Sequence, residues 1–238
     1  MKRFFSTALV LIGLLTCISC GYLFSSVLIS SDVLQFSTTL SSETKNIFAL
    51  STAKNTSKTE LQSMCSDIQS KNGAGYIYKK EETFYLLASA YENYNDAEKV
   101  KANLSVQGIN CEVLKIEVSS TSISGSFSND EKKVVQNCLN SPFETYQKLY
   151  DIAVSLDTSL YDLTKAKLEC NNIFSLLIAN MTNLETVSKD DSSFDKLKKS
   201  IDSQCEILSD LISENYHSNK QNFSSLIKFS YLKILLEN

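Results

Sequence analysis

The sequence predicts an α+β fold: a β-α-β-β-α-β domain with a four-stranded antiparallel sheet, an N-terminal transmembrane helix and a C-terminal α-helical bundle. Three observations predict it: a long uncharged apolar run near the N-terminus, an internal repeat in the middle of the chain, and helical apolar stripes after it. We divide the chain into 1–30, cytoplasmic start and transmembrane anchor; 31–45, stalk; 46–118, sheet domain; 119–129, linker; and 130–238, helical bundle.

The N-terminal segment has the features of a membrane anchor. Lys2 and Arg3 precede a run from Phe4 to about Ile29 without a charged residue, and the first acidic residue is Asp32. The run exceeds the roughly 20 residues that a helix needs to cross a bilayer. Basic residues before the run orient this end toward the cytoplasm. We therefore expect a single-pass protein of the cell membrane whose bulk is extracytoplasmic.

Two alternatives to a retained anchor stay open. A cleaved signal peptide has a shorter apolar core and a small-residue exit, which Ser19-Cys20-Gly21 matches poorly. Lipidation would use Cys20, with Cys17 standing where a leucine-like residue is expected. The next segment, 31–45, is rich in Ser and Thr, and we interpret it as a short stalk.

The sheet domain is predicted from two copies of one unit, each an apolar strand, a polar turn, a helix, a glycine and a second strand. The copies lie about 36 to 38 residues apart and comprise strands 47–51, 73–79, 84–89 and 108–116 and helices 58–70 and 96–107. A duplicated β-α-β unit places both helices on one face of the sheet. The other face is expected to be open, and it is our first candidate for a binding surface.

Local signals set the ends and faces of these elements. Asn95 or Asp96 is expected to cap the second helix, and Gly73 and Gly108 stand where a left-handed helix end favours glycine. Alternation along the strands separates two sets of side chains, but both sets contain apolar residues, so periodicity alone does not orient the strands. The apolar stripes of the two helices should cover one face, and we take one set as the one that meets them. That set is Phe48, Leu50, Ile77, Phe84, Leu86 and Ala88, and the set expected on the open face is Ala49, Ser51, Tyr76, Tyr78, Tyr85, Leu87 and Ser89.

The C-terminal part predicts a compact antiparallel bundle. Apolar residues recur near the 3.6-residue helical period without strict heptads. A first helix from Asp130 is expected to end at about Leu139, before Pro142. Ser141 as a cap, Pro142 and Glu144 then indicate a new helix start.

The sequence carries no pattern typical of an enzyme, a cofactor site or a metal site. Its one histidine, His217, assembles no catalytic triad, and the spacing of the seven cysteines does not favour zinc. We consider Cys65 and Cys111 either a disulfide or two small core residues. A formal net charge of −4 and the lack of a basic stripe argue against a nucleic-acid partner.

Residues 46–118 resemble a SPOR domain. The resemblance rests on the exit Ala88-Ser89-Ala90-Tyr91 from the third strand, the helix start Asn95-Asp96-Ala97-Glu98-Lys99-Val100 and the closing stretch Gly108-Ile109-Asn110-Cys111-Glu112-Val113. It covers about 70 residues of the chain. It implies an RNP-like fold of the ferredoxin-like type and binding of peptidoglycan glycan strands at sites of bacterial cell division or sporulation. The seven residues of the open face become the implied glycan-binding residues.

The leading hypothesis is therefore a membrane-anchored, non-catalytic peptidoglycan-binding protein of the cell envelope. An alternative is an extracytoplasmic scaffold in which the sheet face is buried and the helical bundle binds a protein partner or a second copy of itself. A further alternative is RNA binding, because the same topology serves that purpose. The acidic composition and the expected export argue against RNA.

Overall fold

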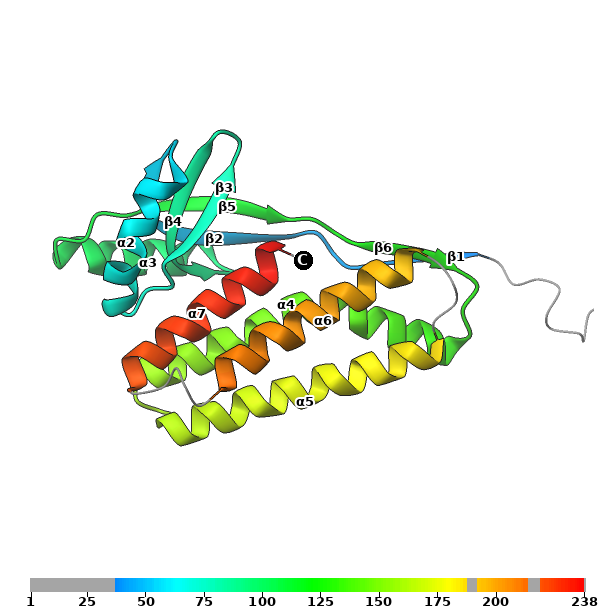
Figure 1. Ribbon diagram of the computed structural model, residues 1–238. Coiled ribbons are helices and arrows are strands. Elements are labelled where there is room, and N and C mark those ends of the chain that lie inside the picture. The colour runs from blue at the N-terminus through cyan, green and yellow to red at the C-terminus, as the bar shows by residue number, and fades with distance from the viewer. Residues whose placement is uncertain (1–36, 188–191, 214–218, 238) are drawn as a thin grey trace, which may run out of the picture. The chain divides into compact units, whose positions relative to one another are not determined.

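The computed structural model describes residues 37–187, 192–213 and 219–237. The described residues of Thr39–Ile123 and of 129–237 belong to one compact unit, and the described residues 37–38 and 124–128 belong to another. The elements are β1 (Thr38–Ser41), β2 (Lys45–Asn55), α2 (Lys58–Ser70), β3 (Tyr76–Lys80), β4 (Thr83–Tyr91), α3 (Tyr94–Val106), β5 (Glu112–Val118), β6 (Ser122–Gly125), α4 (Asn129–Asp157), α5 (Leu163–Val187), α6 (Ser192–Ile212) and α7 (Lys220–Glu237) (Figure 1).

The sheet domain has the β-α-β-β-α-β order that the repeat predicts. Its four strands lie in the order β3-β4-β2-β5, and every neighbouring pair is antiparallel. Leu61 and Ile68 of α2 pack on Leu86 of β4, and Phe84 and Ala88 adjoin this core. The face of β4 that carries Phe84, Leu86 and Ala88 is therefore the one that α2 covers, as expected for these three residues. The described parts of the expected stalk and linker contain β1 and β6, which form a separate two-stranded sheet.

The ends of α2 and α3 differ in detail from the prediction. The cap of α3 is Asn93, whose side chain accepts a hydrogen bond from the backbone N–H of Asn95 at 2.8 Å. Gly108 has the expected positive φ of 78°. After α2, however, Asn72 takes the left-handed conformation, with φ of 68°. Gly73 is needed for a different reason, because a Cβ there would lie 2.6 Å from the side chain of Ile68.

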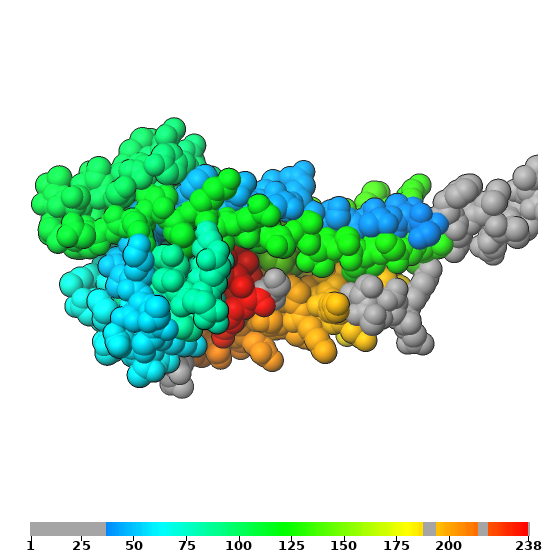
Figure 2. Space-filling view, turned by 90° about the horizontal axis from the view of Figure 1, so that it is seen from above, coloured from blue at the N-terminus to red at the C-terminus, as the bar shows by residue number. Residues whose placement is uncertain are grey.

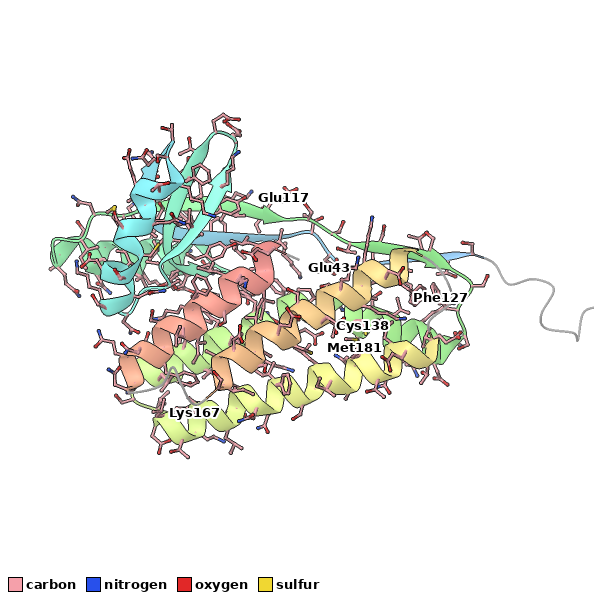
Figure 3. All side chains as sticks on the ribbon, viewed as in Figure 1. Glu43, Glu117, Phe127, Cys138, Lys167 and Met181 are labelled. Carbon is pink, nitrogen blue, oxygen red and sulfur yellow. The ribbon has the colours of Figure 1, made fainter. Side chains whose placement is uncertain are left out.

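The predicted helix break before Pro142 is wrong, because α4 continues through it from Asn129 to Asp157. Proline has no N–H and leaves the carbonyl four residues earlier, that of Cys138, without its helical partner. The hydroxyl of Ser141 donates to this carbonyl at 2.8 Å. The thiol of Cys138 itself faces α5 and lies 3.7 Å from the carbonyl oxygen of Asn180 (Figure 3). A serine beside the proline thus makes the uninterrupted helix possible.

The fold-class and localisation predictions need one correction. The helix expected at the N-terminus and the start of the stalk lie outside the described residues, in the segment 1–36. Within the ranges that are described, none of the helices combines the length and apolar character required to cross a bilayer. Over the described ranges the fold is therefore α+β, built from two sheets and the helices α2 to α7, and it gives no support to the predicted membrane-spanning helix or to the localisation that depended on it.

Candidate binding surface

The candidate surface is the sheet face opposite α2 and α3. Tyr76 pairs with Leu87 and Tyr78 with Tyr85 across β3 and β4, so their side chains share one face. Ile77, between the two tyrosines, packs toward α2 as the alternation requires. Tyr76, Tyr78, Tyr85, Leu87 and Ser89 therefore share this face, as predicted. The prediction for β2 is wrong in part, because Leu50 and not Ala49 stands opposite Ser89, and the register shifts after Leu50. That face is not open along its whole length, because α7 packs on β3 and β4 (Figure 2).

Helix α7 contacts the sheet through side chains that meet polar groups of β3 and β4. The hydroxyl of Tyr231 lies 2.9 Å from the hydroxyl of Ser89 and accepts the backbone N–H of Ala90 at 3.3 Å. At the other end of α7, the hydroxyl of Tyr76 donates to the Glu237 carboxylate at 3.0 Å. The bundle therefore satisfies hydroxyl groups that we had expected to face a ligand.

Burial divides the seven predicted residues into two groups. Four of them are buried on the face that α7 contacts, with exposed fractions of 2% for Ser51, 6% for Tyr76, 0% for Leu87 and 8% for Ser89, while Ala49 is buried at 0% but stands opposite Ala90, on the other face. The expectation of an open face is wrong for these four residues, which we call the covered part. The face is covered there because α7 of the same chain packs on β3 and β4 and hydrogen-bonds to the strands. That these residues bind glycan stays a prediction.

A buried polar network fixes α7 beside the covered part. The ammonium of Lys228 donates to the Asp157 carboxylate at 2.6 Å and to the carbonyl oxygen of Asn72 at 2.8 Å. Asp157 also accepts the hydroxyl of Ser224 at 2.6 Å. Burial lowers the pKa of Lys228, although the nearby Asp157 carboxylate favours its charged form. The network joins α4, α7 and the loop after α2, so it ties the bundle to the sheet domain.

Four tyrosines from the sheet and the bundle form an aromatic cluster behind these contacts. Tyr91 of β4 meets Tyr150 of α4 edge to face, with ring centroids 5.9 Å apart, and Tyr146 meets Tyr231 in the same way at 5.3 Å. Burial raises the pKa of all four hydroxyls, that of Tyr150 to about 12. The hydroxyl of Tyr146 is buried without a hydrogen-bond partner among the described residues. The cluster is therefore a core between the two parts of the unit.

The remainder of the face is partly exposed, and we call it the open strip: Tyr78, Tyr85, Lys54 and Glu112. Tyr78 lies two residues beyond Tyr76, past the contact with the end of α7, and stands opposite Tyr85. On the other side of β4, Lys54 of β2 stands opposite Tyr85 and forms an exposed ion pair of 3.2 Å with Glu112 of β5. The strip offers two aromatic rings and two charged groups on one surface.

The described residues give no support for a metal site, since no three His, Cys, Asp or Glu side chains among them are placed to hold an ion. Cys65 and Cys111 are free thiols, and burial raises the pKa of both. His217 lies outside the described residues.

Comparison with known proteins gives limited information. No family model matches the chain, and no curated protein matches it. Among solved structures, it is similar to the solution structure of the peptidoglycan-binding domain of the B. subtilis cell wall lytic enzyme CwlC. The two are 13% identical, with a TM-score of 0.27, over 32% of this chain and 95% of that domain. This similarity is too low to carry an argument about the function of the chain.

The residues that sequence reasoning missed are those of α7, above all Tyr231, Lys228 and Glu237. One signal was present in the sequence: apolar or small residues occur on every side of this helix, and its buried set includes Ser224 and Ser230. A helix buried on all sides must pack against two partners rather than one.

Proposed function

We propose that this protein binds glycan strands of peptidoglycan without cleaving them, and that the open strip of its sheet makes the contact. One observation carries the proposal: Tyr78 and Tyr85 stand directly opposite each other on β3 and β4 and are partly exposed. They lie on the face where the resemblance to SPOR domains leads us to expect glycan. The covered part of the face takes no ligand in this arrangement because α7 occupies it.

The chemistry of the strip suits a glycan strand. Tyrosine rings offer apolar surface on which the C–H faces of sugar rings pack, and their hydroxyls hydrogen-bond to water or to ligand. Lys54 is exposed, and its one ion-pair partner in the described part of the chain is Glu112 at 3.2 Å, in a pair that contributes little to stability. Its ammonium is thus available to the lactyl carboxylate of a muramic acid residue whose stem peptide has been removed, while Glu112 accepts hydroxyl donors. No step of this role needs a catalytic group.

Sedimentation with purified sacculi tests the proposal. Tyr78→Ala and Tyr85→Ala each remove one ring and are expected to weaken retention about tenfold, which corresponds to about 1.4 kcal/mol of binding free energy. Tyr161→Ala, a change at a partly exposed tyrosine before α5, is the matched control and should bind as the natural protein does. The proposal fails if the natural protein is not retained on sacculi, or if all three variants bind equally.

A second candidate function is a scaffold whose bundle binds a protein partner. The observation that favours it is that most of the sheet face already serves as an internal interface. On the bundle, Leu168, Leu176 and Ile178 of α5 are 53%, 43% and 45% exposed. A scaffold that pairs with its own copy through α5 should sediment as a dimer, and Leu168→Glu should return it to the monomer. Such a result without binding to sacculi would favour the scaffold over glycan binding.

A further inference from the structure

A cavity of about 580 Å³ lies away from the open strip, where four segments of the compact unit meet. The segment joining β1 to β2, the segment joining β5 to β6, and the helices α4 and α6 supply most of its lining. Its volume is within the range typical of small-molecule sites. We name it the α4 cavity and define it by Ser42, Ser119, Asn140, Phe143, Glu144 and Gln147.

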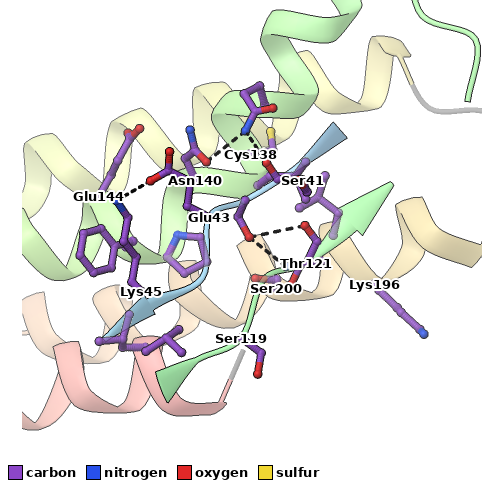
Figure 4. Close-up of a pocket in the computed structure, with 18 of the residues that line it drawn as sticks. Ser41, Glu43, Lys45, Ser119, Thr121, Cys138, Asn140, Glu144, Lys196 and Ser200 are labelled. Carbon is purple, nitrogen blue, oxygen red and sulfur yellow. Dashed lines mark hydrogen bonds and ion pairs between the residues drawn. The ribbon is translucent and has the colours of Figure 1, made fainter. Parts of the chain in front are cut away.

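Several polar groups of the α4 cavity are not used by the fold. Among the described residues, no hydrogen-bond partner holds the hydroxyl of Ser119, the carboxylate of Glu144 or the amide of Gln147. Other polar groups of the wall are fixed: Gln136 donates to the Asn140 side chain at 3.1 Å and to the carbonyl of Ser41 at 3.0 Å (Figure 4). The cavity therefore has a rigid wall and free donors and acceptors.

The charges of the cavity disfavour an anionic ligand. Lys45 is paired with Glu43 at 2.6 Å and lies over the Phe143 ring, 5.4 Å from its centroid. Lys196 points away from the other labelled residues in Figure 4. Lys45 differs from Lys54 of the open strip, because it has a shorter ion pair and a second partner in the Phe143 ring. With Lys45 held in this way, Lys196 turned away and Glu144 unpaired, the cavity favours a phosphate or carboxylate less than a neutral group. The lining fits a neutral ligand.

We propose that the α4 cavity binds a neutral saccharide. Hydroxyl and amide groups of a sugar match Glu144, Gln147 and Ser119 as acceptors and donors. The partly buried Phe143, with the buried Leu139 beside it in the lining, gives apolar surface for ring C–H groups. The choice of an N-acetylated sugar rests on the proposed function, because glycan strands of peptidoglycan consist of such sugars. The chain then contacts glycan at two separate places, the open strip and the α4 cavity.

The test uses the disaccharide N,N′-diacetylchitobiose as the probe, and its binding is measured by saturation-transfer NMR. The full chain carries Tyr78→Ala and Tyr85→Ala, so that the open strip is removed and the cavity remains. We expect a saturation-transfer signal, and we expect Gln147→Ala with Asn140→Ala in the same background to raise the dissociation constant at least about tenfold. Gln107→Ala, at the exposed end of α3, is the matched control and should leave binding unchanged.

Folding of each variant is checked by circular dichroism and thermal melting. Glu144→Gln, an isosteric change at an exposed side chain, is a second cavity variant that should also weaken binding of the disaccharide. The cavity proposal is overturned if the disaccharide does not bind the background protein, or if it binds equally well after the cavity changes. Its failure is separate from that of the proposed function: retention on sacculi that depends on Tyr85 would stand even if the cavity bound no sugar.

Discussion

The covered part and the open strip belong to one face of one sheet, yet they meet different surroundings. In the covered part, the hydroxyl of Ser89 is 2.9 Å from that of Tyr231, and Leu87 is completely buried. In the open strip, Tyr78 and Tyr85 remain partly exposed, and the charged pair beside them is in contact with solvent. The boundary between the two lies at Tyr76, whose hydroxyl reaches the Glu237 carboxylate.

The difference shows that the same residue type can contribute to stability at one position of a strand and to binding at a position two residues further along. Tyr76 and Tyr78 are two residues apart on β3, but only Tyr76 is held by α7. A buried side chain contributes to folding through its area and its satisfied hydrogen bonds. A partly exposed one contributes little to stability and is available to a ligand. Substitutions in the covered part should therefore lower mainly the stability, and substitutions in the open strip should lower mainly the binding of a ligand.

The largest effect on stability is expected for Tyr231→Ala. The side chain is fully buried and contacts Tyr146, Ser89 and Ala90, so its removal leaves a cavity and unpaired polar groups. We expect a loss of about 3–5 kcal/mol in the free energy of unfolding, measured by urea denaturation. Tyr231→Phe keeps the ring and should cost only about 1–2 kcal/mol. A loss no greater than that of Tyr85→Ala would show that α7 does not hold the covered part.

A loss of folding stability is the second effect that we expect, at alkaline pH. Burial raises the pKa of Tyr91, Tyr146, Tyr150 and Tyr231 in the folded state, so the unfolded chain releases these protons first. Their contribution to stability is complete below about pH 10 and is lost as the pH rises from there through the folded values. Lys228 has the opposite effect on stability. Because burial lowers its pKa in the folded state, the free energy of unfolding rises with pH below about 10.5.

Melting temperatures recorded from about pH 8 to pH 11.5 should thus fall steeply above pH 10, because four tyrosines outweigh one lysine. The phenolate absorbance should rise together with unfolding. If these hydroxyls ionised in the folded protein without loss of structure, the aromatic cluster would not be the sealed core described above.

The smallest effect on stability is expected for Lys54→Ala in the open strip. Its ion pair with Glu112 is exposed, with side-chain exposures of 58% and 47%, so the free energy of unfolding should change by no more than about 0.5 kcal/mol. Retention on sacculi should nevertheless weaken and become less sensitive to salt. Lys99→Ala, which breaks the exposed ion pair with Asp96 on α3, is the matched control and should alter neither property.

The sheet domain could be predicted because its signals are local. Alternation along 84–89 assigned Leu86 and Tyr85 to opposite faces, and the helix predicted at 58–70 coincides with α2. A buried sheet face was one of the alternatives, but which helix covers it, and through which residues, could not be predicted in the same way. It depends on contacts between residues far apart, such as Ser89 and Tyr231, which no local pattern reveals. The helix break predicted before Pro142 was wrong for a related reason, because the hydroxyl of its neighbour Ser141 offsets the hydrogen bond that proline removes from the helix.

The bond between Ser89 and Tyr231 has a consequence for synthesis as well as for the finished protein. It joins residues 142 positions apart, so the sheet domain leaves the ribosome long before its covering helix does. During that interval Leu87 and Tyr76 face solvent or any other apolar surface nearby. Closing so long a loop is slow, and contacts of this range delay folding. The nascent chain therefore has a period in which its sheet is exposed to chaperones and to mispairing with other nascent chains.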